Sequence, residues 1–173
     1  KNNNGYTPLG LLRARGYDNV DVTLLIQMLS QCPTVVQSIA TKGKNTITLF
    51  DLLKDEKPQA PKEFLLKVIE LCPNLTRTDE VDDDGKSPLE VAIEFNHSKD
   101  VLLSLIEYQH LPSKSDGSIP LLQNAKTGNT PLHIILDFKI FKNREVAQVL
   151  MTVNSKYLQT KNHMGNYPLD IAI

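Results

Sequence analysis

Apolar segments of two kinds alternate along the chain. Segments of the first kind, such as LEVAIEF at residues 89–95, are apolar on most sides, which predicts a short helix buried between neighbours. Segments of the second kind are apolar on one face only, which predicts longer amphipathic helices. We expect these helices over DVTLLIQMLS (21–30), KEFLLKVIEL (62–71), DVLLSLIEY (100–108) and REVAQVLMTV (144–153). The pattern therefore predicts an all-α chain built from helix pairs.

A short motif precedes most of the buried helices. It occurs as GYTPLG (5–10), GKSPLE (85–90), GNTPLH (128–133) and GNYPLD (165–170). A threonine or serine before the proline can cap a helix, and proline is tolerated at the first helical position because no N–H is needed there. Ser87 and Glu90 also have the spacing of a capping box. The glycine suits a tight turn with positive φ, so each motif predicts a turn followed by a helix start.

The motifs recur at a regular spacing. Their leucines are Leu9, Leu89, Leu132 and Leu169, and a fifth copy lies at Leu49, in TLFDLL, which has lost its Thr-Pro cap. Cys32 precedes Leu49 by 17 residues, as Cys72 precedes Leu89, which supports this register. The steps are 40, 40, 43 and 37 residues. A period in this range indicates a stacked array of helical units.

The four motifs resemble the ankyrin repeat family, whose pattern is T-P-L-H-x-A with a period of about 33 residues. The resemblance covers the whole chain, although the units here are longer. Gly16 also falls where the family has a glycine between its two helices. The resemblance implies one solenoid of helix-turn-helix units with projecting turns or β-hairpin fingers. We expect repeats at 1–41, 42–81 (degenerate), 82–124 and 125–161, with a partial fifth at 162–173.

The resemblance also implies where a partner would bind, since fingers and the exposed side of the first helices form the family's usual groove. Carried over to this chain, the finger positions are Asn3, Asn4, Tyr6, Asp83, Asp84, Lys86, Lys126, Thr127, Asn129, His163, Met164 and Asn166. The matching helix positions include Glu94 and Asp137. The fingers differ in character, which suits selective recognition of one protein.

We therefore expect a protein–protein interaction scaffold or adaptor domain whose partner is another protein. The alternative is a regulatory or assembly domain of a larger enzyme or channel, because the sequence stops inside the first helix of a unit. A small-ligand site in the long linkers is a third interpretation. The net charge of −1 over 173 residues gives no reason to expect nucleic acid. No apolar run or leader predicts membrane insertion or secretion, so we expect the cytoplasm, with the nucleus as the alternative.

Candidate chemistry is sparse. We expect His133 to brace its turn through hydrogen bonds to the backbone. His97, His110 and His163 have no partner at metal-ligand spacing, which favours surface or linker positions. The run Asp82–Gly85 resembles the start of a calcium loop, but Val91 stands where the bidentate glutamate would be. No catalytic motif occurs, so we predict neither an enzyme nor a bound metal or cofactor.

The two cysteines are each followed by proline. Equivalent positions in neighbouring units should lie about 10 Å apart, which exceeds the reach of a disulfide. We therefore expect Cys32 and Cys72 to end helices, with the cysteine in the core.

Overall fold

The computed structural model describes residues 8–17, 20–31, 47–55, 59–76, 80–109, 121–137 and 144–172. In these ranges the chain is all-α, as predicted, and contains no β-strand, so the expected β-hairpin fingers are replaced there by hydrogen-bonded turns. The chain divides into two compact units, Lys1–Leu75 and Thr76–Ile173, which are called unit 1 and unit 2 below. A short 3-10 helix, η1 (Pro73–Thr76), spans the boundary. The five repeat boundaries remain a prediction.

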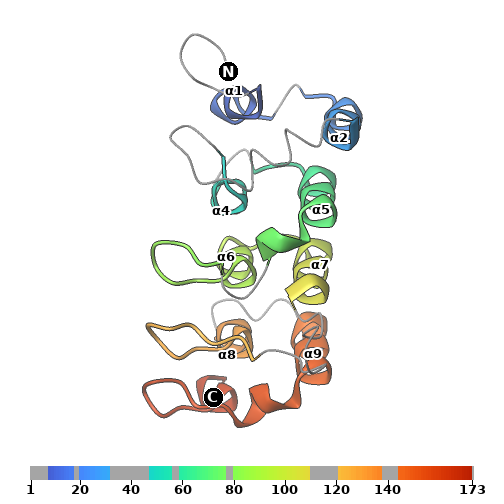
Figure 1. Ribbon diagram of the computed structural model, residues 1–173. Helices are drawn as coiled ribbons and strands as arrows, with labels where there is room; N and C mark the ends of the chain where they lie inside the picture. The colour runs from blue at the N-terminus through green and yellow to red at the C-terminus, as the bar shows by residue number, and fades with distance from the viewer. Residues whose placement is uncertain are drawn as a thin grey trace. The chain divides into compact units, whose positions relative to one another are not determined.

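Unit 1 contains α1 (Pro8–Arg15), α2 (Val22–Gln31), α4 (Leu49–Leu53) and α5 (Lys62–Leu71). The amphipathic helices α2 and α5 pack side by side (Figure 1). Both lie where the sequence predicts them, and α5 matches its predicted range at both ends. Their shared core includes the fully buried side chains of Phe64, Val68 and Leu29. The ring of Phe64 lies 6.5 Å from that of Tyr17, which extends this core towards α1.

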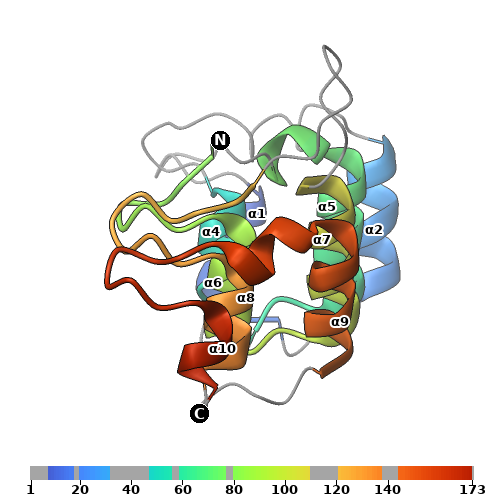
Figure 2. The same cartoon turned by 90° about the horizontal axis from the view of Figure 1, so that it is seen from below.

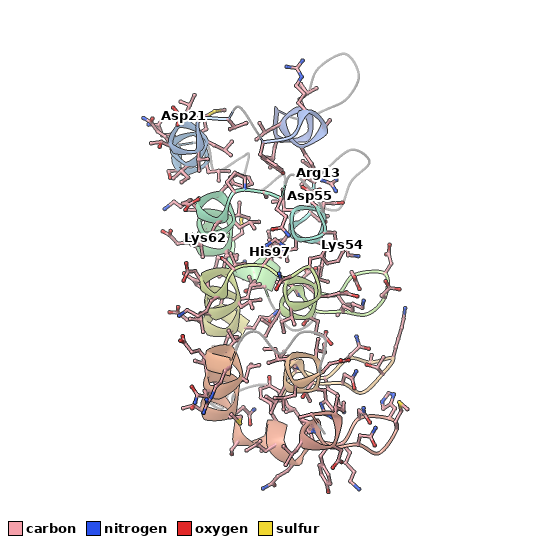
Figure 3. All side chains as sticks on the ribbon, turned by 180° about the vertical axis from the view of Figure 1, so that it is seen from behind. Arg13, Asp21, Lys54, Asp55, Lys62 and His97 are labelled. Atoms are coloured by element: carbon pink, nitrogen blue, oxygen red, sulfur yellow. The ribbon has the colours of Figure 1, made fainter. Side chains whose placement is uncertain are left out.

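A polar cluster joins α1 to the end of α4. Arg13 Nε donates to Asp55 Oδ1 at 2.7 Å, and the Tyr17 hydroxyl donates to Asp55 Oδ2 at 3.2 Å. Figure 3 shows Arg13 and Asp55 pointing toward one another. Burial, followed by the charge of Asp55, raises the pKa of Tyr17. Both oxygens of Asp55 are therefore used to hold the two helices together.

The copy of the motif at Leu49, which is the second along the chain, keeps a helix cap despite the loss of its Thr-Pro pair. Thr48 is the N-cap of α4, and its hydroxyl accepts from the Asp51 N–H at 3.1 Å. Asp51 in turn accepts from the Thr48 N–H at 2.8 Å, which completes a capping box. This copy has therefore lost the Thr-Pro pair, as expected, but its helix is capped by another residue. The cap stands one residue nearer to the leucine than in the other copies, and the proline is not needed.

Unit 2 contains α6 (Pro88–Glu94), α7 (Lys99–Gln109), α8 (Pro131–Leu136), α9 (Arg144–Val153), the 3-10 helix η2 (Ser155–Gln159) and α10 (Pro168–Ile171). These helices form two layers (Figure 1). The inner layer stacks α6, α8 and α10, and the outer layer packs α7 against α9. The inner helices are buried on most sides, as predicted: every residue of α6 from Pro88 to Ile93 is buried.

The predicted turns of unit 2 and the predicted capping box of α6 are confirmed. Gly85, Gly128 and Gly165 have φ of +76°, +70° and +83°, and a proline opens each of α6, α8 and α10. Ser87 and Glu90 form the predicted capping box: the Ser87 N–H donates to Glu90 Oε2 at 2.6 Å, and the Glu90 N–H donates to Ser87 Oγ at 3.3 Å. The local sequence pattern therefore determines how each inner helix begins.

Two other sequence-based expectations have different outcomes. Cys72 is buried at the C-terminal end of α5 and is not in a disulfide, as expected, whereas Cys32 lies outside the described residues. The expected surface position of His97 is wrong, because its side chain is only 4% exposed. The His97 N–H donates to the Ala92 carbonyl at 3.0 Å, so this residue closes the turn between α6 and α7.

Candidate binding surface

Three turns of unit 2 form the candidate surface. They are the loops 82–86, 124–129 and 162–166, which we call the loop face, and they extend to the same side of the inner helices (Figure 2). In each loop, backbone hydrogen bonds of 2.8–3.0 Å join the first residue to the glycine and to the last residue. Each loop is therefore a closed turn, with its own backbone groups largely satisfied.

One side chain braces each loop from within. Asp82 Oδ1 accepts from the N–H groups of Asp84 and Lys86 at 2.9 and 2.8 Å. The amide oxygens of Asn124 and Asn162 accept two backbone N–H groups each in the same way. The bracing role of these three side chains was not predicted from the sequence. An aspartate or asparagine shortly before each motif glycine is nevertheless a recognisable turn signal. The acidic run that resembles a calcium loop is thus part of a turn.

Neighbouring loops are joined by hydrogen bonds between residues distant in sequence. The Asn124 side chain donates to the Gly85 carbonyl at 2.9 Å, and Lys126 Nζ donates to the Asp83 carbonyl at 2.9 Å. The third loop is held to the second in the same manner: the His163 N–H donates to the Thr127 carbonyl at 3.0 Å, and the Asn162 side chain donates to Asn129 Oδ1 at 2.9 Å. The three loops therefore form one connected surface rather than independent fingers.

His133 links the inner layer to the last loop. Its Nδ1 lies 3.1 Å from the Thr130 N and 2.8 Å from Thr130 Oγ1, and its Nε2 lies 3.0 Å from the Asn166 carbonyl oxygen. A neutral ring with its proton on Nε2 satisfies all of these contacts, since Nδ1 must accept the Thr130 N–H. Burial lowers the pKa of His133, which favours the same neutral form. The predicted bracing role is confirmed, and the histidine also spans two motif copies.

A groove of about 250 Å³ lies beside the loop face in unit 2. It brings together five of the residues predicted for partner binding: Lys86, Glu94, Thr127, Asn129 and Asp137. Sequence analysis did not place the other lining residues in a site: Glu90, Asn124, His133, Ile134 and Ile171. The motif pattern assigns these positions to helix starts, turns and packing. No local signal in the sequence therefore distinguishes them from residues with a purely structural role.

Glu90 is the buried charge of this groove. The residue is 4% exposed, and its Oε2 accepts from the Ser87 N–H. Its Oε1 is also buried and makes no hydrogen bond of ordinary geometry to the described part of the chain. Burial raises the pKa of Glu90, while hydrogen bonds with Ser87 and then with the side chain of Asn124 partly oppose the shift. Glu90 therefore lines the groove with a buried carboxylate, one oxygen of which lacks a hydrogen bond of ordinary geometry to the described residues.

The rim of the groove carries an ion pair. Lys86 Nζ donates to Glu94 Oε2 at 2.7 Å, with the two side chains 32% and 47% exposed. This hydrogen bond raises the pKa of Lys86, so the lysine remains charged. Together with Glu90 and Asp137, the charged residues in the described part of the lining are three acids and one base, and His133 is neutral. The groove is therefore net acidic.

The other predicted binding residues are placed as follows. Asp83, Asp84, Lys126 and His163 are exposed on the loop face, and Met164 is 82% exposed at the tip of the last loop. Asn166 is half-buried and uses its carbonyl to hold His133. Asn3, Asn4 and Tyr6 lie outside the described residues. Several predicted contact residues therefore also hold the loops together, which sequence reasoning did not foresee.

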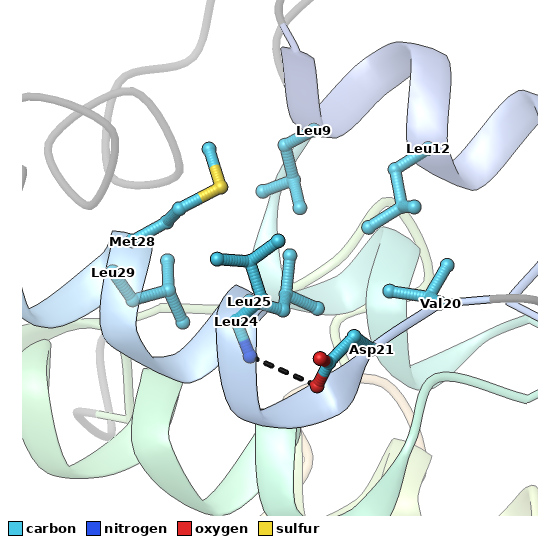
Figure 4. Close-up of a pocket in the computed structure, with 8 residues that line it drawn as sticks. All are labelled: Leu9, Leu12, Val20, Asp21, Leu24, Leu25, Met28 and Leu29. Carbon is cyan, nitrogen blue, oxygen red and sulfur yellow. Dashed lines mark hydrogen bonds between the residues drawn. The ribbon is translucent and has the colours of Figure 1, made fainter.

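Unit 1 contains a concavity of its own, and the side chains that line it differ in chemistry from those of the groove in unit 2. It measures about 200 Å³ and is lined by Leu9, Leu12, Val20, Asp21, Leu24, Leu25, Met28 and Leu29 from and around α1 and α2 (Figure 4). Asp21 is the one polar side chain among them, and its Oδ1 accepts from the Thr23 and Leu24 N–H groups at 2.9 and 3.1 Å. Asp21 therefore caps α2, and the described residues that line the cavity provide no convergent polar groups.

No family model, curated protein or solved structure matches this chain. Among the described residues, no group of three or more histidine, cysteine, aspartate or glutamate side chains could hold a metal ion. None of the helices in the same ranges is long and apolar enough to cross a membrane.

Proposed function

We propose that this chain is an array of ankyrin-like repeats that acts as a protein-binding scaffold or adaptor. The observation that carries the proposal is the loop face of unit 2, where three interlinked loops lie beside an acidic groove. The helix pairs, the capped inner helices and the projecting turns are what the family resemblance implies. The regulatory or assembly role in a larger protein remains the alternative.

A connected loop face supports binding because it is organised before the partner arrives. Each loop is closed by its own backbone bonds, and the bonds between loops restrict their relative motion. Ordering flexible loops on binding costs free energy, so a surface that is already ordered loses less on association. The exposed side chains vary from acidic Asp83 to apolar Met164, and such variety favours one partner over others.

The proposal assigns no catalytic role to the described residues. His133 would be the obvious general base, but Thr130 and Asn166 already occupy its two ring nitrogens. A base needs a free nitrogen within reach of a substrate proton. A binding function therefore accounts better for the way in which this histidine is used.

A pull-down with the whole chain as bait, from a lysate of its own source, tests the proposal. The loop variant carries Asp83→Ser, Asp84→Ser and Met164→Ser, which change exposed side chains and leave the hydrogen bonds between loops in place. Asp84→Ser also removes the exposed ion pair between Asp84 and Lys126, whose N···O distance is 3.9 Å. The matched control carries Asp100→Ser, Glu107→Ser and Leu158→Ser, which remove two exposed acids and one exposed apolar residue elsewhere in unit 2. Circular dichroism first establishes that all three baits fold equally well.

The expected result is a protein that the natural bait and the control bait enrich and that the loop variant loses. If the same proteins bind all three baits, the loop face is not the working surface. If no protein is enriched by any bait, the scaffold function of this segment is wrong.

A further inference from the structure

Resting on the proposed function, we propose that the groove of unit 2 receives an arginine side chain of the partner protein, with Glu90 as its counter-charge. The groove was identified above by its position beside the loop face. Its charge, its size and the unsatisfied oxygen of Glu90 together determine what fits.

The first step concerns Glu90 Oε1. This oxygen is buried and has no hydrogen bond of ordinary geometry to the described residues, and the contribution of the Asn124 side chain offsets only part of the effect of burial on the carboxylate. Such an oxygen is costly, because burial removes the water that would otherwise solvate it. A donor from a bound partner would remove this cost, whereas an acceptor would increase it. The ligand group in contact with Glu90 is therefore a hydrogen-bond donor.

The second step concerns charge. Among the described residues that line the groove, Glu90, Glu94 and Asp137 outnumber Lys86, and Lys86 is already paired with Glu94. The neutral form of His133 adds no positive charge. A cation is therefore favoured over a neutral donor such as an amide, because a charged donor makes a stronger hydrogen bond to a carboxylate.

The third step distinguishes a side chain from a metal ion or a cofactor. The described residues provide no set of three or more ligands that could hold a metal ion. The groove, at about 250 Å³, lies below the usual range of roughly 300–1,000 Å³ for small-molecule sites. Ile134 and Ile171 contribute apolar lining beside the acids. This combination suits one long side chain with an apolar stem and a cationic head.

The fourth step favours arginine over lysine. A guanidinium group is more weakly hydrated than an ammonium group, so it loses less on entering a partly buried site. It also offers several donors in a planar fork, which could serve Glu90 Oε1 and a second acceptor together. Arginine is also enriched among the residues that contribute most to protein–protein interfaces.

Peptide selection followed by a double-mutant cycle tests this inference on the whole chain. Random linear peptides of about twelve residues are displayed and selected against the natural chain, and those that the loop variant still binds are discarded. The tightest remaining peptide is then synthesised with each arginine replaced in turn by citrulline, which keeps the shape and removes the charge. Glu90→Gln is the test variant, because its amide oxygen can still accept from the Ser87 N–H.

Glu107→Gln is the matched control, since it removes the same charge from an exposed position on α7. We expect one arginine position to be enriched among the selected peptides. Citrulline at that position should weaken binding to the natural chain about ten-fold or more, and far less to the Glu90→Gln variant. Binding to Glu107→Gln should stay within about two-fold of the natural chain, because exposed distant charges are screened.

The alternative outcomes separate the two proposals. If peptides bind the loop face without any enriched basic residue, or with lysine in place of arginine, the arginine inference is wrong and the scaffold proposal stands. If every selected peptide is retained by the loop variant, the loop face is not the binding surface and the scaffold proposal is wrong; the arginine inference is wrong as well if Glu90→Gln also retains every peptide with unchanged affinity. If Glu90→Gln fails to fold, Glu90→Asp takes its place in the cycle, because it withdraws the same carboxylate by one methylene group, and equal citrulline effects on both chains would then overturn the inference.

Discussion

Replacing Gly128 by alanine tests the connection between the second and third loops of unit 2. Gly128 has φ +70°, and an added Cβ would lie 2.5 Å from His163 Cδ2 and 2.6 Å from the His163 backbone N. Real Cβ atoms do not approach backbone so closely, so the third loop would have to move. That movement would break the hydrogen bond from the His163 N–H to the Thr127 carbonyl, now 3.0 Å long.

Three costs add up for Gly128→Ala. The left-handed conformation costs about 1 kcal/mol for alanine, the lost hydrogen bond about 1 kcal/mol, and the overpacking about 1–3 kcal/mol. We therefore expect the free energy of unfolding to fall by about 3 kcal/mol or more. Gly165→Ala is the matched control: φ is +83°, but nothing lies within 4 Å of its added Cβ, so only the conformational cost of about 1 kcal/mol applies.

Gly85→Ala serves as a second control within an internal loop, because its added Cβ meets only the flexible Lys126 side chain, at 3.7 Å. Urea titration followed by far-ultraviolet circular dichroism would compare the three variants with the natural chain. Hydrogen exchange at the His163 amide would report whether the bond between the loops is lost. If Gly128→Ala is no less stable than Gly165→Ala, the reasoning about contact between these loops is refuted.

Three further predictions concern single polar side chains. Folding lowers the pKa of His133 from 6.5, so the unfolded chain binds protons more readily than the native chain does. The free energy of unfolding should therefore fall as the pH drops below 6.5. The urea midpoints measured at about pH 7.5 and about pH 5.5 should differ less in His133→Gln than in the natural chain. Tyr157→Phe should cost about 1 kcal/mol in a urea titration, because the buried Leu122 N–H loses the hydroxyl that accepts it at 3.3 Å; an unchanged midpoint would contradict this. Asp55→Ala should destabilise unit 1 by about 2 kcal/mol, since it removes the acceptor of Arg13 and of a buried tyrosine hydroxyl, and thermal unfolding would measure the loss.

Much of the fold is predictable because its signals are local. The amphipathic pattern places α5 and α9 at their observed ends, and the motif proline marks the first residue of each inner helix in unit 2. These features depend on contacts within about one turn of helix, so a short stretch of sequence contains the whole cause. The cap on α4 was missed because Thr48 stands one residue away from the expected position. A capping box needs only a three-residue spacing and tolerates the absence of proline.

The candidate site was only partly predictable for the opposite reason. The motif register identified Lys86, Glu94 and Asp137, which do line one groove. It did not indicate that Asn124 holds the preceding loop, 39 residues away, or that His97 is buried. Contacts over such distances depend on which turns the packing of the helices brings together, and no local pattern records that.

The sequence by itself therefore determined where the helices begin, how the turns close and which residue types reach the loop tips. Each of these features is a short-range consequence of hydrophobic spacing, capping and backbone freedom. Only the tertiary structure decided that the three loops are linked and that His133 spans two motif copies. It also decided that Glu90 is buried beside the groove, with one oxygen that has no hydrogen bond of ordinary geometry to the described residues. Hydrogen bonds and burial between distant segments are consequences of packing, and they arise when neighbouring units stack.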